Sequence, residues 1–147
     1  LCIAIGGQPF AINSASKSLY HAATVMACNN LVSLLEISKG MLVQAGVDVK
    51  HSGNPLDLLI QQTVTNYLSS GAQKALTGPI ARGDVDTVAS HLLALQSTPD
   101  GWQDAYRGLG KMAVNISAKQ GQASPEQLQD ILQLLNIDPN NQTVDIT

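Results

Sequence analysis

The chain has 147 residues, of which 44% are hydrophobic, 13% charged and 3% aromatic, and its net charge is −3. This length favours one compact domain, and the scarcity of aromatic residues predicts that Leu, Ala, Val and Ile fill its core. The acidic balance, without any run of Lys and Arg, argues against nucleic acid as a partner. So few charged residues indicate a surface that a second copy or another partner covers.

The cysteines, the apolar runs and the histidines indicate where the protein resides and what it binds. Cys2 and Cys28 lie far apart without metal-ligand spacing, which indicates free thiols in a reducing compartment, so we expect a cytoplasmic protein. No apolar run is long enough to cross a bilayer, so we expect no membrane partner. The three histidines are scattered, and no metal site is expected. Because the first residue is Leu1, the chain is a candidate fragment of a longer protein.

The first twelve residues, "LCIAIGGQPFAI", are typical of the end of a structural unit. We expect an apolar helical turn, a Gly-Gly break and a short strand from Pro9 to Ile12. A lone strand leaves its backbone groups unpaired, so the sheet it belongs to is expected upstream or in another chain.

Helical patterns fill the chain from Ser14 onward. A long helix is expected from Ser14, a candidate N-cap, to a terminating Gly46. Gln127 completes a capping-box pattern with Ser124. The expected N-caps of the later helices are Asn54, Asp84, Thr98 and Ser124. The coarse expectation is one strand followed by about five helices, with residues 138–147 as a polar tail.

The long helix carries the first candidate site. At roughly 100° per residue, one stripe is polar at first and then apolar: Lys17, His21, Thr24, Cys28, Leu31 and Leu35. Lys17 and His21 are one turn apart and suit hydrogen bonding and proton transfer to a substrate. Spacing alone favours the alternative, a surface lysine and a histidine bonded to nearby backbone.

Three more polar residues on this helix have structural explanations. Asn29 and Asn30 interrupt an apolar run, and we expect at least one of them to be buried and to bond across a helix interface. Such a structural bond is favoured over ligand contact. Tyr20 is equally consistent with a packing residue whose hydroxyl reaches water.

The stretch "LTGPIARGDVDTVASHL" combines a shaped turn with a helix start. Gly78 before Pro79 is expected to be extended, and Gly83 permits an unusual dihedral angle. Asp84 is expected to cap a helix that buries Val88, Leu92 and Leu95. Arg82 lies near the positive end of that helix, so it should pair with an acidic side chain, a carbonyl cluster or an anionic ligand. An adhesion role for Arg-Gly-Asp is rejected, and His91 is expected to be a satisfied helix histidine.

Four stretches together resemble a known family: "GGQPFAI", "KSLYHAATVMACNNLVSLLE", "ALTGPIARGDVDTVASHLLAL" and "AYRGLGKMAV". They resemble the C-terminal domain of the DUF2520 proteins, Rossmann-like oxidoreductases related to ketopantoate and pyrroline-5-carboxylate reductases and to 6-phosphogluconate dehydrogenase. The resemblance implies an all-α helical bundle like the C-terminal domain of 6-phosphogluconate dehydrogenase-like proteins, preceded by a short remnant strand of a missing Rossmann domain. Residues 1–13 would end that dinucleotide-binding domain, residues 14–137 would form the helical domain, and residues 138–147 the tail.

The resemblance also implies partners and residue roles. NADP or NAD would bind the full-length protein, a small-molecule substrate would bind the interdomain cleft, and the helical domain would form a homodimer. No cofactor is expected for this chain alone, because it lacks a Gly-x-Gly-x-x-Gly turn. The implied catalytic residues are Lys17 and His21. The implied substrate-binding residues are Tyr20, Asn29, Gly78 and Arg82, and Pro79, Gly83 and Asp84 shape the loop and cap the helix. The alternative from the residues alone is a non-catalytic helical dimerisation module.

Overall fold

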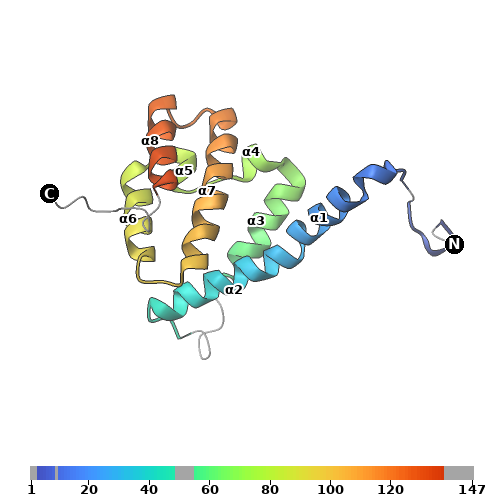
Figure 1. Ribbon diagram of the computed structural model, residues 1–147, viewed down its shortest axis with the longest axis horizontal. Helices are drawn as coiled ribbons and strands as arrows, with labels where there is room; N and C mark the ends of the chain where they lie inside the picture. The colour runs from blue at the N-terminus through green and yellow to red at the C-terminus, as the bar shows by residue number, and fades with distance from the viewer. Residues whose placement is uncertain (1–2, 9, 49–54, 138–147) are drawn as a thin grey trace. The chain divides into compact units, whose positions relative to one another are not determined.

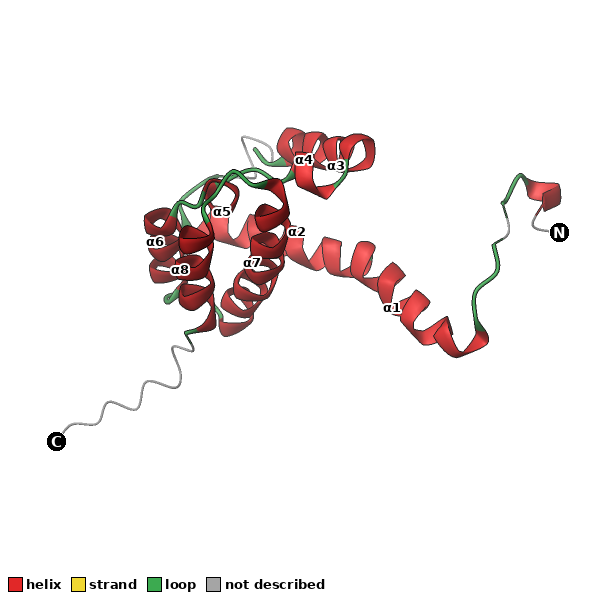
Figure 2. Cartoon of the chain, turned by 90° about the horizontal axis from the view of Figure 1, so that it is seen from above, coloured by secondary structure: helices red, strands yellow, loops and turns green. Residues whose placement is uncertain are grey.

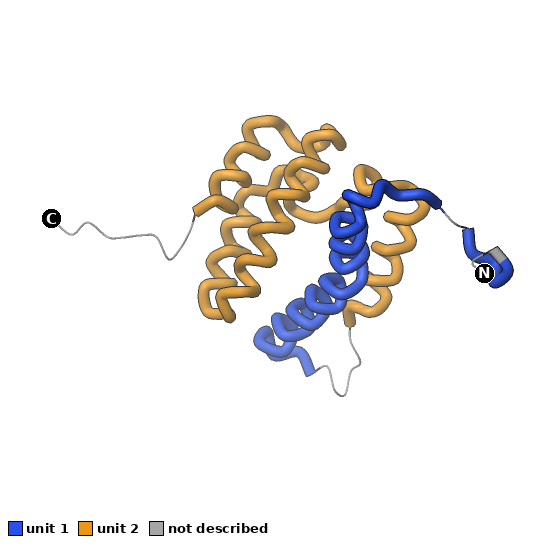
Figure 3. The backbone as a smooth tube through the Cα atoms, turned by 45° about the vertical axis from the view of Figure 1, so that its right-hand side comes forward, with its two compact units in different colours: residues 1–51 blue, residues 52–147 orange. Residues whose placement is uncertain are grey.

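The computed structural model describes residues 3–8, 10–48 and 55–137, and within these ranges every regular element is helical (Figure 2). The expectation of an all-α fold is confirmed. In chain order the elements are the 3-10 turns η1 (Ile3–Ile5) and η2 (Ser14–Ser16) and the helices α1 (Lys17–Ala27), α2 (Asn29–Gln44), α3 (Asp57–Ser70), α4 (Ala72–Ala75), α5 (Pro79–Arg82), α6 (Val85–Leu95), α7 (Asp100–Gln120) and α8 (Pro125–Asn136) (Figure 1). Two compact units, residues 1–51 and 52–147, are distinguished (Figure 3).

The strand expected from Pro9 to Ile12 is not formed. Phe10, Ala11 and Ile12 have no regular structure, and Pro9 lies outside the described residues. A strand needs a paired neighbour, and the described ranges contain no second strand that could supply one. The apolar turn expected before it is present as η1.

The first unit consists mainly of one long helical segment with a break (Figure 1). Ser14 is not its cap: the Asn13 side chain accepts a hydrogen bond from the Ala15 amide at 3.0 Å and begins η2. The expected single helix is divided at Cys28, whose φ and ψ of −115° and −66° depart from helical values. Its backbone N–H still bonds the Thr24 carbonyl at 3.0 Å, so α2 follows α1 almost without interruption.

Gly46 ends this segment as expected. Its φ is +88°, which glycine adopts readily. The amide of Gly46 bonds the carbonyl of Val43, and the amide of Val47 bonds the carbonyl of Leu42, both at 3.0 Å. These two bonds are those of a Schellman motif.

In the second unit, α7 packs against α4, α5, α6 and α8. The buried hydrophobic residues are all aliphatic, as the composition predicts: Ile80, Ala81, Val88, Leu92, Leu95, Val114, Ala123, Leu128, Ile131 and Leu135. They come from α5 to α8 and from the turn before α8, so the core lies among these helices.

Two of the four expected N-caps of this unit, Asp84 and Ser124, are confirmed. The Asp84 side chain accepts from the Thr87 amide at 3.1 Å, and Ser124 and Gln127 form the full capping box. Thr98 is not an N-cap, because its hydroxyl donates to the Leu95 carbonyl at 2.7 Å and closes α6 instead. The expected cap Asn54 and the expected tail at 138–147 lie outside the described residues.

Candidate functional site

Lys17, Tyr20 and His21 lie near the start of α1 and are exposed. Lys17 and His21 are four residues apart and therefore share one face of the helix. The Tyr20 ring packs edge-on against Phe10, with centroids 5.7 Å apart, which gives Tyr20 a packing partner and leaves it 46% exposed. The first turns of α1 thus present a lysine and a histidine to solvent.

The two asparagines do not make the expected bond across a helix interface. Asn29 and Asn30 are both exposed at the start of α2. The Asn30 amide donates to the Met26 sulfur at 2.8 Å within the helical segment. The expectation of a buried asparagine is wrong because neither α1 nor α2 has a buried residue against which its amide would need a partner.

The Gly-Pro and Arg-Gly-Asp sequences bracket the short helix α5. Gly78 has a φ of +92° and a ψ of −169°. Its ψ is that of an extended residue, as expected, but its φ is positive, which favours glycine. Pro79 is the first residue of α5, where its missing N–H costs nothing. Gly83 ends α5 in the left-handed conformation, and Asp84 then caps α6.

This loop is fastened to the core on two sides. The buried Ser117 hydroxyl of α7 lies 3.2 Å from the Ile80 carbonyl and 3.4 Å from that of Ala81, and it donates to this pair of carbonyls. A Cβ added to Gly83 would lie 2.5 Å from Gln127 Oε1 and 2.9 Å from the Cβ of Ala123. Gly83 therefore packs its backbone directly on the capping box of α8, and the loop has little freedom to move.

Arg82 is the exposed side chain of this fixed loop. Its side chain is 61% exposed, and its Nη2 lies 3.9 Å from Asp84 Oδ2, beyond hydrogen-bonding distance. Asp84 directs its oxygens to Thr87 instead, accepting from the Thr87 hydroxyl at 2.7 Å as well as from its amide. Arg82 is also the last residue of α5, where a cation is favourable, so its position near α6 is less unfavourable than expected.

The pKa of the Asp84 carboxyl is lowered from its usual value. The hydrogen bond from the Thr87 hydroxyl lowers it most, followed by the bond from the Thr87 amide. Desolvation opposes this shift, and electrostatic attraction to Arg82 and then His91 lowers the pKa of the carboxyl a little further.

His91 and Tyr106 form a pair that sequence reasoning missed. His91 Nδ1 lies 2.9 Å from the Tyr106 hydroxyl, and the two rings meet edge-on with centroids 5.9 Å apart. His91 was expected to be a satisfied helix histidine, and this bond supplies its partner. His91 and Tyr106 are fifteen positions apart and lie on α6 and α7, so no helical spacing signals the contact. Burial raises the pKa of the Tyr106 phenol above its usual value.

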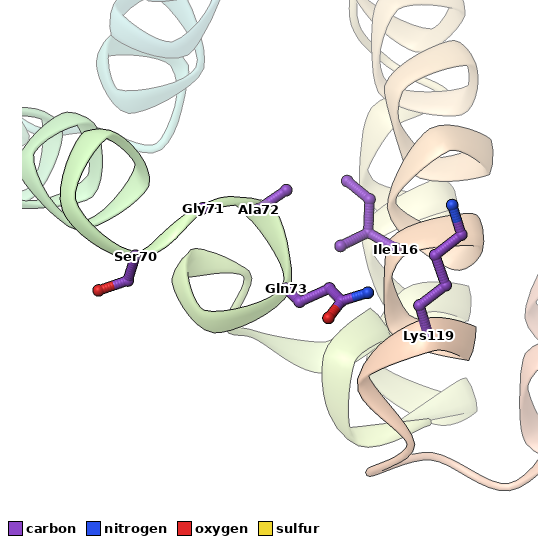
Figure 4. A pocket seen from close by; sticks show the side chains of 6 residues that line it. All are labelled: Ser70, Gly71, Ala72, Gln73, Ile116 and Lys119. Carbon is purple, nitrogen blue, oxygen red and sulfur yellow. The ribbon is translucent and has the colours of Figure 1, made fainter.

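A pocket of about 290 Å³ lies between the α3–α4 turn and α7 (Figure 4). Its lining residues are Ser70, Gly71, Ala72, Gln73, Ile116 and Lys119. None of the residues predicted for the site lines it, and Lys119 is its single charged lining group, so it is a poor candidate for the predicted cleft.

The predicted site residues fall into two groups. Lys17, Tyr20, His21 and Asn29 belong to the first unit. Gly78, Pro79, Arg82, Gly83 and Asp84 belong to the second unit, where the loop brings them together. The functional roles of both groups stay predictions.

Three further features of the described residues concern metal binding, free thiols and membrane spans. They contain no group of three His, Cys, Asp or Glu side chains arranged to hold a metal ion. Cys28 is a free, exposed thiol, and Cys2 lies outside the described ranges. None of the described helices combines the length and hydrophobicity needed to span a bilayer.

Comparison with family models gives a match to "Domain of unknown function (DUF2520)" over residues 1–113. The chain belongs to the DUF2520 family. The match covers α1 to α6 and ends inside α7, so the loop with Arg82 lies within the DUF2520 region and α8 lies beyond it. A comparison with curated proteins and one with solved structures find no match.

The expectation that this chain alone binds no dinucleotide stays a prediction. A dinucleotide cradle needs a strand, a glycine-rich turn and a helix that opens at the pyrophosphate. The described residues contain no strand, and Gly6 and Gly7 precede a helix only after an irregular segment.

Proposed function

We propose that the chain is the substrate-cleft and dimerisation domain of a cytoplasmic NAD(P)-dependent oxidoreductase acting on a small molecule. The resemblance of its four stretches to Rossmann-like oxidoreductases supports the reaction class. The wide separation of Cys2 and Cys28 supports the compartment. The nicotinamide cofactor would be held by another domain of the natural polypeptide.

The exposed guanidinium of Arg82 is the observation that supports substrate binding. Pro79 and Gly83 fix the backbone on both sides of it, and Asp84 is committed to Thr87. The guanidinium therefore keeps donors for a ligand and has a rigid base. Such a group suits a carboxylate or a phosphate, which it binds through two parallel hydrogen bonds.

On the same family resemblance, Lys17 and His21 would polarise the substrate and transfer a proton. Both are exposed on one face of α1. A lysine ammonium polarises a carbonyl oxygen, and a histidine donates or accepts a proton near neutral pH. Tyr20, Asn29 and Gly78 would line the substrate.

The apolar surface of α1, α2 and α3 supports the dimer. None of these helices contains a buried residue. Their exposed large hydrophobic residues are Leu19, Tyr20, Met26, Leu31, Val32, Val43, Leu58, Leu59, Val64, Tyr67 and Leu68. α1 and α2 belong to the first unit and α3 to the second, and a homodimer interface would cover exposed apolar side chains of this kind on either unit.

The second candidate is a non-catalytic helical dimerisation module, which the same apolar surface favours. In that case Asp84 only caps α6, and Gly83 only seats the loop on α8. Dimerisation does not separate the two candidates, so the discriminating tests must address Arg82 and the cofactor.

The substrate half is tested by NAD(P)H oxidation in the natural polypeptide with a panel of small oxo acids and their phosphorylated counterparts. For an accepted substrate, Arg82→Gln should raise KM about 10- to 100-fold, because it removes a charged hydrogen bond. Lys74→Gln is the matched control, since it removes an exposed positive charge elsewhere. Equal kinetics for Arg82→Gln and the wild type would contradict the anchor role.

The dimer is tested by sedimentation equilibrium of the 147-residue chain. Leu68→Glu on α3 should shift the chain to monomers, because it places a charge in the proposed interface. Leu109→Glu on α7 is the control, because Leu109 is an exposed leucine of a helix with a buried side. A wild-type chain that stays monomeric at high concentration would refute the dimer proposal.

A further inference from the structure

One edge of α6 carries a row of polar side chains beside the core. Asp84, Thr87 and His91 are three and four residues apart and lie on one side of the helix, next to the fully buried Val88. Tyr106 of α7 reaches this row through its bond to His91. Arg82 stands at its beginning, beside Asp84.

The two ends of the row have complementary chemistry. Arg82 offers the donors of a guanidinium. At the other end, the Tyr106 hydroxyl is held against His91 Nδ1, which leaves Nε2 of the exposed imidazole for a ligand. The neutral phenol and the imidazole can exchange donor and acceptor roles, so this end accepts either a hydroxyl or a carbonyl oxygen.

We propose that Arg82, His91 and Tyr106 form a binding site for a small organic acid that carries a second oxygen function. The guanidinium binds the carboxylate, and the His91–Tyr106 pair binds a hydroxyl or carbonyl oxygen further along the ligand. The assignment rests on the proposed function in one respect, because it takes Arg82 as the anchor. It adds two residues and a ligand class that the function alone does not supply.

The geometry sets the length and charge of the ligand. Asp84 and His91 are seven residues apart, which is about 10 Å along a helix, although helical side chains lean toward the N-terminus and shorten the gap. The second oxygen must therefore lie several carbons from the carboxylate. Asp84 balances the charge of Arg82, so the site favours a single carboxylate over a highly charged group such as a diphosphate.

The test compares two acids that differ only in the second oxygen. The 147-residue chain is titrated with 6-hydroxyhexanoate and with hexanoate, and the ring ¹⁵N signals of His91 are followed by NMR. We expect the hydroxy acid to bind about 3- to 10-fold more tightly, which is the worth of one hydrogen bond. Failure of both acids to bind, or equal affinities, would overturn the proposal.

Variants of Arg82, His91 and Tyr106 show which end of the ligand each residue binds. Tyr106→Phe should bring the affinity ratio of the two acids close to one, whereas Arg82→Gln should weaken both acids by the same factor. His91→Asn provides the same test as Tyr106→Phe at an exposed position, where folding is least affected. A ratio that survives His91→Asn would overturn the assignment.

Because no nicotinamide is present in this titration, its outcome is separate from that of the oxidoreductase proposal. If the protein binds NADPH but not the acids, only the proposed acid site is refuted. Acid binding by a natural polypeptide that does not bind NADPH would keep the site and remove the oxidoreductase.

Discussion

Replacing Gly83 by alanine tests whether the Arg82 loop is rigidly seated on α8. Gly83 has a φ of +70°, and a left-handed backbone costs an alanine about 1–2 kcal/mol. The new Cβ would also lie 2.9 Å from the Cβ of Ala123, which cannot rotate away, and 2.5 Å from Gln127 Oε1. Moving the Gln127 amide breaks its 2.9 Å bond with the Ser124 amide. Overpacking of this kind costs a further 1–3 kcal/mol, roughly.

Gly121 offers a matched control for this substitution. Its φ is +77°, nearly that of Gly83, but no atom lies within 4 Å of its added Cβ. Gly121→Ala should therefore lose only the backbone part. Urea unfolding monitored by circular dichroism should show Gly83→Ala less stable than Gly121→Ala by about 1–3 kcal/mol. Equal losses for the two variants would refute the close contact between the loop and the capping box.

Four further substitutions probe the stability of the second unit. Gly110→Ala should destabilise the protein by about 1 kcal/mol or more, because the added Cβ would lie 3.0 Å from Cδ2 of the buried Leu135. Gly108→Ala in the same helix is the control, since its added Cβ has open space. It should stabilise the protein by up to about 1 kcal/mol in the same unfolding assay. Ser117→Ala should cost about 1–3 kcal/mol in thermal unfolding, since it leaves the Ile80 and Ala81 carbonyls without the buried donor, and an unchanged melting temperature would contradict this role. Asp84→Asn should lower the free energy of unfolding at neutral pH, because the pKa of the Asp84 carboxyl is depressed in the folded state. The difference from wild type should shrink as the pH falls below 3.8, since protonation removes the stabilising charge. A difference that does not depend on pH would contradict the interactions with Thr87 and Arg82 as its cause.

Features that depend on neighbours in the sequence were predictable. The Asp84 cap, the Ser124–Gln127 box and the Gly46 terminator each involve residues within five positions, and their chemistry is visible in the sequence. The aliphatic core followed from composition, because the chain has too few aromatic residues to build it otherwise.

Features that depend on distant partners were not predictable. The strand at Pro9 to Ile12 requires a neighbour that no pattern in the chain supplies. The Ser117 bonds to α5 span 36 and 37 residues, and His91 and Tyr106 meet across two helices. Thr98 illustrates local ambiguity, since a threonine before proline is able to cap the next helix or close the previous one.

The candidate site was predicted only in part. The bend at Pro79, the unusual dihedral angle of Gly83 and the Asp84 cap followed from the sequence, whereas the helix α5 and the positive φ of Gly78 did not. The structure adds that Gly83 is required by contact with α8 as well as by its dihedral angle. The His91–Tyr106 end of the polar row had no sequence signal. The roles of Lys17, His21 and Arg82 remain predictions that their exposure permits.

The oxidoreductase proposal is tested most directly by a fluorescence titration of NADPH and NADH into the natural polypeptide, with the 147-residue chain titrated in parallel. Our account predicts saturable binding by the natural polypeptide and none by the 147-residue chain, whose described residues provide no dinucleotide cradle. A folded natural polypeptide that binds neither nucleotide would contradict the account and leave the dimerisation module as the function of these helices.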